Sequence, residues 1–176
     1  MNQSDWHRVS WMLVDGATAL MRAFGTHVRY DPAGEAAHPP ADGVLAVIGF
    51  GGRSFRGSLI ASANRGLLER SCPVACAGND EQLQDWLGEI ANQLLGRLKA
   101  QLLAHGIVIE LGTPATVAGL ELRVRPRNEC HTPPLWLVAE SDWLVARLDA
   151  TAEPNVLLCL SPDPSNSATE GEVLLF

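Results

Sequence analysis

Residues 79–106 have the sequence NDEQLQDWLGEIANQLLGRLKAQLLAHG and form the longest periodic segment of the chain. Asn79 or Asp80 can serve as the N-cap, because a short polar side chain there accepts a hydrogen bond from the first helical turn. Gly106 suits the position just after a helix, where a positive φ is common. No residue between these ends breaks a helix outright, so the segment predicts one long helix.

At about 100° per residue, the apolar side chains of this segment gather on one side of the helix. They are Leu87, Ile90, Ala91, Leu94, Leu95, Leu98 and Leu102. On the opposite side, within about 40° of one line, lie five residues that we call the polar strip: Asp85, Glu89, Asn92, Gly96 and Lys99. The pattern predicts that the first set is buried and that the polar strip faces outward.

A polar outer face is ordinary for a surface helix, so a solvated face is the simplest interpretation of the strip. Two residues of the strip favour a second interpretation, a face that docks on another molecule. Gly96 in mid-helix costs about 1 kcal/mol relative to Ala, and it lets another backbone approach closely. Asn92 is a poor helix former, because its side chain competes for backbone hydrogen bonds. These unfavourable choices beside Glu89 favour a docking face.

The spacing of four residues resembles the signature of the CheX, CheC and FliY phosphatases of bacterial chemotaxis. That signature is Asp or Ser, three residues, Glu, two residues, Asn, twenty-one or twenty-two residues, and Pro. Asp85, Glu89, Asn92 and Pro114 have this spacing. Gly96 and Lys99 also resemble the helix continuation of CheX-like sequences.

The resemblance implies a function for the strip. The substrate would be the phospho-aspartate of a response regulator such as CheY, and the regulator would supply Mg²⁺, so no cofactor of the chain's own is expected. Glu89 would pair with a lysine of the regulator, and Asn92 would hold a water in line with the phosphorus. Asp85 would lie at the rim or stabilise the helix start, while Gly96 and Lys99 would adjoin the partner.

Other implications of the resemblance concern the number of sites and the assembly. CheC-type proteins carry a Glu and an Asn in both halves, but the nearest residues in the first helix here, Asp15 and Thr18, do not match. One site and a CheX-like chain are therefore implied, and a homodimer is compatible with this. Pro114 is expected to be structural. The alternative function is a non-catalytic binding or scaffold module of the same fold, for a receiver domain or a flagellar or chemotaxis protein.

The remaining chain predicts an α+β fold. A first helix is expected over residues 5–24, capped by Ser4 or Asp5, and a short helix over 65–70, capped by Asn64. Strands are expected at 27–30, 44–50, 54–61 (with a bulge at Gly57), 107–111, 116–124, 135–139, 143–148 and 156–160. This order is a weak duplication of helix, strand and hairpin. It resembles the CheC-like fold, in which two long helices pack on one face of a mixed sheet.

Length and composition suit one domain, with 176 residues and 47% hydrophobic residues. We expect a domain over residues 1–160 and a mobile tail over 161–176. The net charge of −7 argues against nucleic-acid binding. No signal peptide and no membrane-length apolar run is visible, so a cytoplasmic protein with no membrane contact is expected.

The cysteines do not predict a metal site. Cys72 and Cys76 are closely spaced, but Cys130 and Cys159 do not form the second close pair that a four-ligand zinc site needs. We expect reduced thiols, as in other cytosolic proteins.

Overall fold

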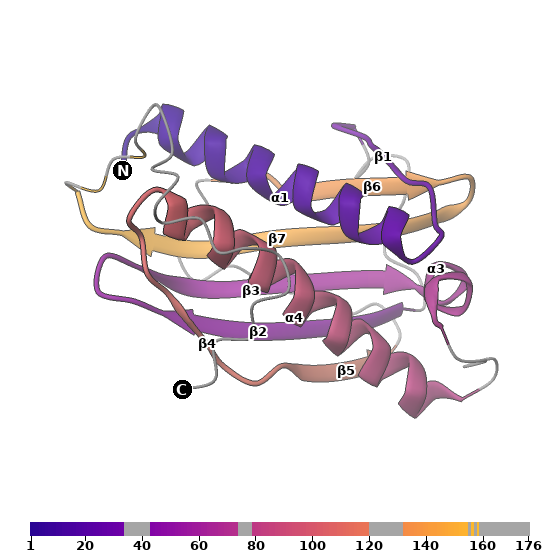
Figure 1. Ribbon diagram of the computed structural model, residues 1–176. Coiled ribbons are helices and arrows are strands. Elements are labelled where there is room, and N and C mark those ends of the chain that lie inside the picture. The colour runs from indigo at the N-terminus through magenta and orange to yellow at the C-terminus, as the bar shows by residue number, and fades with distance from the viewer. Residues whose placement is uncertain (34–42, 74–78, 120–131, 155, 157, 159–176) are drawn as a thin grey trace.

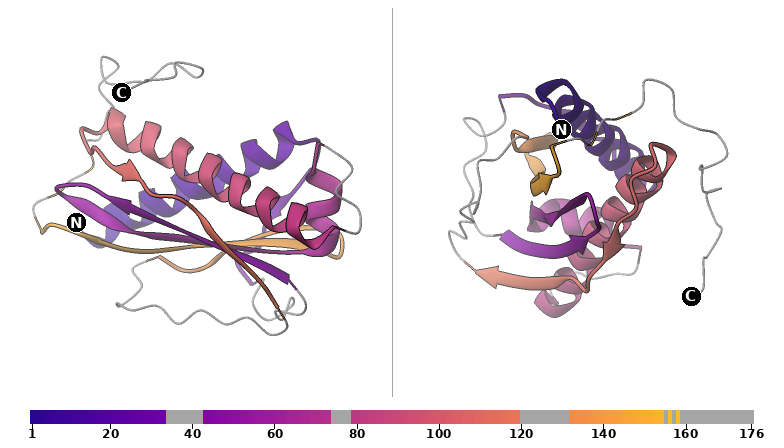
Figure 2. Two further views of the ribbon diagram at one scale, coloured as in Figure 1. Left: turned by 90° about the horizontal axis from the view of Figure 1, so that it is seen from below. Right: turned by 90° about the vertical axis from the view of Figure 1, so that its left-hand side faces the viewer.

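Two long helices lie on one face of a seven-stranded sheet in the structure, a computed structural model (Figure 1). They are α1 (Gln3–Ala23) and α4 (Asp80–Ala104), and the short helix α3 (Arg65–Ser71) lies near one end of the sheet. The strands are β1 (Arg29–Tyr30), β2 (Gly43–Gly51), β3 (Phe55–Asn64), β4 (Glu110–Leu111), β5 (Ala115–Gly119), β6 (Leu135–Ala139) and β7 (Asp142–Ala152). The structure describes residues 1–33, 43–73, 79–119, 132–154, 156 and 158. The views in Figure 2 confirm two layers, as the sequence predicts for this α+β fold.

The strand order is β1-β6-β7-β3-β2-β4, and β5 also pairs with β2. Every pairing among the described strands is antiparallel, so the expectation of a mixed sheet is wrong. Strands joined by tight hairpins must be antiparallel, and the two hairpins β2–β3 and β6–β7 form the centre of the sheet. The part of the chain up to α3 and the part from α4 onward exchange strands: β1 pairs with β6 of the second part, and β4 and β5 pair with β2 of the first. This exchange fits the predicted duplication.

The helix ends follow from polar caps. Asn79 caps α4 by accepting a hydrogen bond from the backbone N–H of Gln82 at 3.2 Å, and Gly106 follows the helix with φ of +76°. The first helix begins earlier than predicted, with Asn2 as its N-cap. Asn2 Oδ1 accepts from the Asp5 N–H at 2.9 Å, and Asp5 Oδ2 accepts from the Asn2 N–H at 3.3 Å. Asp5 is thus the reciprocal partner of a capping box rather than the cap itself.

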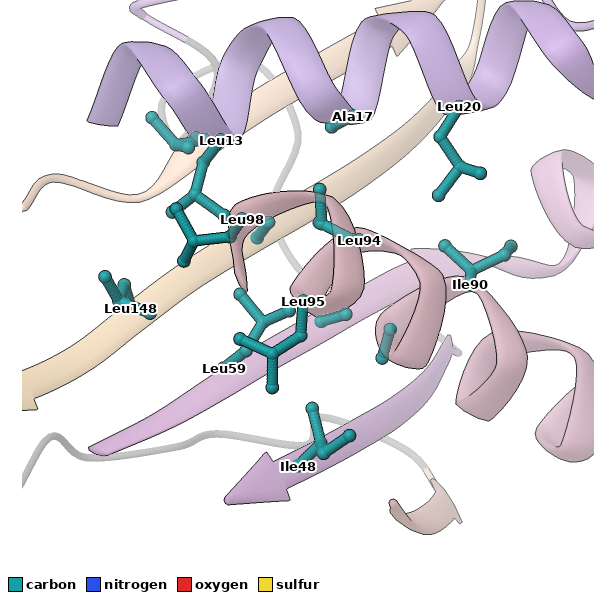
Figure 3. Packing of buried hydrophobic residues seen from close by; sticks show 14 of the residues in the cluster. Leu13, Ala17, Leu20, Ile48, Leu59, Ile90, Leu94, Leu95, Leu98 and Leu148 are labelled. Carbon is teal, nitrogen blue, oxygen red and sulfur yellow. The ribbon is translucent and has the colours of Figure 1, made fainter. Parts of the chain in front are cut away.

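The core lies between the two helices and the sheet (Figure 3). All seven apolar residues predicted for the inner face of α4 are buried. They meet α1 residues such as Leu13 and sheet residues such as Leu59. A Cβ at Gly16 of α1 would lie 3.5 Å from Leu94 Cδ1, so the two helices approach closely at this point. Because α4 packs against both the sheet and α1, its outer face has one fixed orientation.

Gly57 does not mark a bulge. The pairing runs through it without interruption, with Phe50 on one side and Ala150 on the other. A Cβ at Gly57 would lie 2.6 Å from the Ala150 Cα and would collide with the carbonyl oxygen of Asp149. Glycine is therefore required here by the close approach of β7.

The C-terminal half of the strand prediction is confirmed in part. The strand expected at 107–111 is limited to β4. Residues 107–109 connect α4 to this strand without pairing in the sheet, and Ile107 and Ile109 are buried in the core. The strand expected at 116–124 corresponds to β5, and its residues 120–124 lie outside the described residues. Val156 and Leu158 are not in a strand, and the rest of 156–160 and the tail 161–176 lie outside the described residues.

Cys72, at the C-cap of α3, is disulfide-bonded, and its partner lies outside the described residues. The expectation of reduced thiols is therefore wrong for this cysteine. Among the helices of the described residues, none combines the length and the apolar character needed to cross a membrane.

Candidate functional site

The polar strip lies on the outer face of α4, as its spacing predicts. Asp85 and Glu89 are exposed, and Asn92, Gly96 and Lys99 are half-buried. None of the five is buried beneath the chain's own residues. The strip is therefore a surface that another molecule can reach.

Asn92 lies in the middle of α4, one turn from Glu89. Its side-chain amide has no hydrogen bond to any of the residues that the structure describes. Both its N–H donors and its carbonyl oxygen are thus available to water or to a partner. The backbone that carries it is part of a helix that the core holds in place.

Glu89 is held by its neighbour on the next turn. Gln93 Nε2 donates a hydrogen bond of 2.6 Å to Glu89 Oε1, and none of the ion pairs among the described residues includes Glu89. The negative charge of Glu89 therefore remains uncompensated within this part of the chain. The sequence reasoning missed Gln93, although a Glu and a Gln four residues apart on a helix are neighbours that can bond.

Two glycines of α4 have opposite surroundings. Apart from its own stretch of helix, a Cβ at Gly96 would meet no heavy atom of the described residues within 4 Å, so this part of the strip is open with respect to them. A Cβ at Gly88 would lie 3.3 Å from Thr116 Cγ2 and 3.8 Å from the Pro114 Cβ and Cγ. The start of β5 therefore packs against α4 one turn before Asn92.

This packing brings Pro114, the fourth residue of the signature, close to the helix that carries the other three. Pro114 directly precedes β5, yet it lies beside Gly88, which adjoins the strip on α4. It offers no hydrogen-bond donor, and its contacts are with the helix, which agrees with the structural role expected for it. Gly88 and Thr116 complete this contact and were not singled out from the sequence, because no local pattern links residues so far apart in the chain.

Charge is unevenly distributed along α4. Asp80, Glu81, Asp85 and Glu89 lie in its first half, whereas Lys99 lies near its other end. Arg65 of α3 donates to Asp80 Oδ1 at 2.7 Å and to Glu69 Oε1 at 2.8 Å. The hydrogen bond to Asp80 and then that to Glu69 raise the pKa of Arg65. Asp80 is thus compensated, while the carboxylates of the strip have no cationic partner among the described residues.

The polar strip does not line the cleft of about 870 Å³ that lies near the C-terminal end of α4. That cleft lies between the β2–β3 turn and the segment that follows the helix, and its lining includes Gly51, Arg53 and Glu110. In the described part of the chain, no group of three or more His, Cys, Asp or Glu side chains could hold a metal ion. An amide and a carboxylate on an open helix cannot enclose a reaction by themselves, but they can complete a site on a second molecule.

Comparisons with known proteins identify relatives of this fold. The sequence model of the family described as chemotaxis phosphatase CheX matches residues 44–133. CheX from Vibrio vulnificus is similar in structure, with a TM-score of 0.70 and 17% identity over 81% of this chain and 96% of that one. A CheC-like superfamily protein from Shewanella sp. PV-4 has a TM-score of 0.68 and 16% identity over 86% of this chain and 100% of that one.

A chain in the CheX–CheY–BeF3–Mg²⁺ complex from Borrelia burgdorferi has a TM-score of 0.54 and 14% identity over 80% of this chain and 96% of that one. No curated protein sequence matches this chain. The likenesses in structure show a shared fold, and the family match covers more than half of the chain, including the polar strip and Pro114. The chain belongs to the chemotaxis phosphatase CheX family.

Proposed function

We propose that this chain stimulates hydrolysis of the phospho-aspartate on the receiver domain of a CheY-like response regulator. The observation that carries the proposal is Asn92, which is only partly buried, whose amide has no hydrogen-bond partner among the described residues, and which lies one turn from exposed Glu89. Membership of the CheX family supports a phosphatase. The solved complex of a structurally similar CheX with CheY supports the choice of a receiver domain.

In this proposal Glu89 and Asn92 enter the active site of the regulator. Glu89 pairs with a lysine there and so orients α4, while Asn92 holds a water in line with the phosphorus. Catalysis by positioning does not require a tuned pKa, which suits an amide. A hundredfold acceleration corresponds to about 2.7 kcal/mol, an effect that one well-held water can supply. Mg²⁺ is held by the regulator, and no residue of this chain is assigned to it.

The other strip residues shape the partner surface. Asp85 borders the regulator; it lies beyond the first turn of α4, where the helix dipole acts most strongly, so a role in stabilising the helix start is not assigned to it. Gly96 lets the surface of the regulator approach, because a Cβ there would have no atom of another described element within 4 Å. Lys99 faces the acidic rim of the receiver site. The homodimer and the cytoplasmic location stay predictions of the sequence.

One assay separates the proposal from its alternative. A CheY-type receiver domain is phosphorylated with acetyl phosphate, and its loss of phosphate is followed with and without the chain. We expect an acceleration that saturates as the chain concentration rises. If the chain binds the receiver loaded with BeF3⁻ and Mg²⁺ but leaves the phosphoryl lifetime unchanged, the non-catalytic binding module is correct and the catalytic proposal is wrong.

Replacing Gly96 by Ala should separate stability from activity. Among the described residues, the added methyl group meets no atom beyond its own stretch of helix, so the helix should gain up to about 1 kcal/mol, measured as a higher Tm. The same methyl stands where the regulator approaches, and we expect the KM for the phosphorylated receiver to rise about fivefold, which corresponds to about 1 kcal/mol.

Gly88→Ala is the matched control for stability, because it is the same substitution on the same helix. Its methyl would lie 3.3 Å from Thr116 Cγ2, so the gain in helix propensity should be offset by the displacement of Thr116. An unchanged KM in Gly96→Ala would show that Gly96 does not belong to the surface that contacts the partner.

A further inference from the structure

We propose that Gln93 is a positioning residue for Glu89: a neutral donor that orients the carboxylate without cancelling its charge. This inference rests on the proposed function, in which Glu89 receives a cation of the regulator. Gln93 itself touches neither the phosphoryl group nor the water. Its role is to present Glu89 in one orientation before the partner arrives.

The geometry gives Gln93 one specific contact. Its Nε2 lies 2.6 Å from Glu89 Oε1, within hydrogen-bond distance of the carboxylate. Glu89 has no other hydrogen bond and no ion pair among the described residues. One carboxylate oxygen is therefore held, and Oε2 is left to accept from a lysine of the partner.

The chemical type of the donor matters more than the bond alone. A Lys four residues after a Glu forms a favourable ion pair on a helix, and such a pair would compete with the cation of the regulator. The same helix shows the contrast, because Asp80 is compensated by the guanidinium of Arg65 at 2.7 Å. Glu89 is held by an amide instead, so its orientation is restricted while its full charge remains available.

Without a donor at position 93, Glu89 would sample several rotamers, and ordering it on docking would weaken binding. The tests are Gln93→Met, which has similar length and no donor, and Gln93→Lys, which neutralises the carboxylate. We expect Met to raise the KM for the phosphorylated receiver about threefold, and Lys to raise it about tenfold. The kcat should stay unchanged in both variants, because Asn92 is not altered.

The matched control is Gln101→Met, the same substitution on the same helix at a half-buried position outside the polar strip. It should leave both KM and kcat unchanged. Salt provides a second readout. The KM of Gln93→Lys should depend less on ionic strength than that of the natural chain, since the charge that attracts the partner is compensated.

A double-mutant cycle tests whether Gln93 acts through Glu89. In a Glu89→Ala background, Gln93→Met should have no further effect on KM or on the dissociation constant for the receiver loaded with BeF3⁻ and Mg²⁺. The proposal is overturned if Gln93→Met binds and reacts like the natural chain, or if its loss persists undiminished in Glu89→Ala.

A measurement on the chain alone distinguishes failure of this inference from failure of the proposed function. If the natural chain does not accelerate hydrolysis, the proposed function fails, and the NMR signal of the Gln93 side-chain amide still decides whether the contact exists. Glu89→Ala should shift that resonance and speed its exchange with water. An unchanged resonance would show that Gln93 does not hold Glu89.

Discussion

Replacing Asn92 by Ala is expected to lower the stimulated dephosphorylation of a receiver domain about a hundredfold, which corresponds to about 2.7 kcal/mol. The amide is the group that we assign to the attacking water, and Ala offers neither a donor nor an acceptor. Because Asn92 makes no hydrogen bond to the described residues, its removal leaves no buried group without a partner. Ala is also the better helix former, so the Tm should stay equal or rise.

The measurement is the rate of phosphate loss at saturating chain, together with the affinity for the receiver loaded with BeF3⁻ and Mg²⁺. We expect kcat to fall and the affinity to be largely retained. Asn79→Ala is the matched control, because Asn79 caps the same helix. It should lower the free energy of unfolding by about 0.5–2 kcal/mol and leave kcat unchanged. An Asn92→Ala variant with the natural kcat would remove Asn92 from catalysis.

Replacing Phe55 by Ala is expected to lower the free energy of unfolding by about 3–5 kcal/mol. Phe55 is 0% exposed and is among the largest fully buried side chains. Its ring centre lies 5.3 Å from that of Phe50 and 5.7 Å from that of Trp6, so it joins β2, β3 and α1. No neighbouring side chain can fill the space of a whole aromatic ring without moving one of these elements.

Urea denaturation measures this loss, with Val117→Ala as the control. Val117 is 50% exposed on β5, and its truncation should change the free energy of unfolding by no more than about 0.5 kcal/mol. Where Phe55→Ala remains folded, its kcat should match that of the natural chain, because Phe55 lies in the core and not on the polar strip. A loss below about 1 kcal/mol would contradict the central position of Phe55 in the core.

The long helix and its two faces could be predicted because their causes are local. Asn79 and Gly106 lie at the ends of the segment, and the helical period alone assigns Leu87 to the inside and Glu89 to the outside. The burial of Leu87 and the exposure of Glu89 confirm the assignment. The roles of Glu89 and Asn92 depend on a second molecule, and they stay predictions.

The sheet was less predictable than its hairpins. A hairpin needs only a short turn between two neighbouring strands, and both hairpins occur at the strand pairs predicted at 44–50 with 54–61 and at 135–139 with 143–148. The order of the hairpins in the sheet depends instead on which strands pair across long separations, and the exchange of β1 and β4 between the halves has no local signal. The same reason explains Gly57, whose small size is required by β7 and not by a bulge.

By itself the sequence determined that α4 exists, where it begins and ends, and which of its sides carries the polar strip, because caps and period act within a few turns. The tertiary structure alone decided that Gly16 of α1 lies against Leu94, that Arg65 compensates Asp80, and that β5 approaches α4 at Gly88. Each of these contacts joins residues from different elements. Such distances are set by the packing of the whole core, which spacing along one segment does not encode.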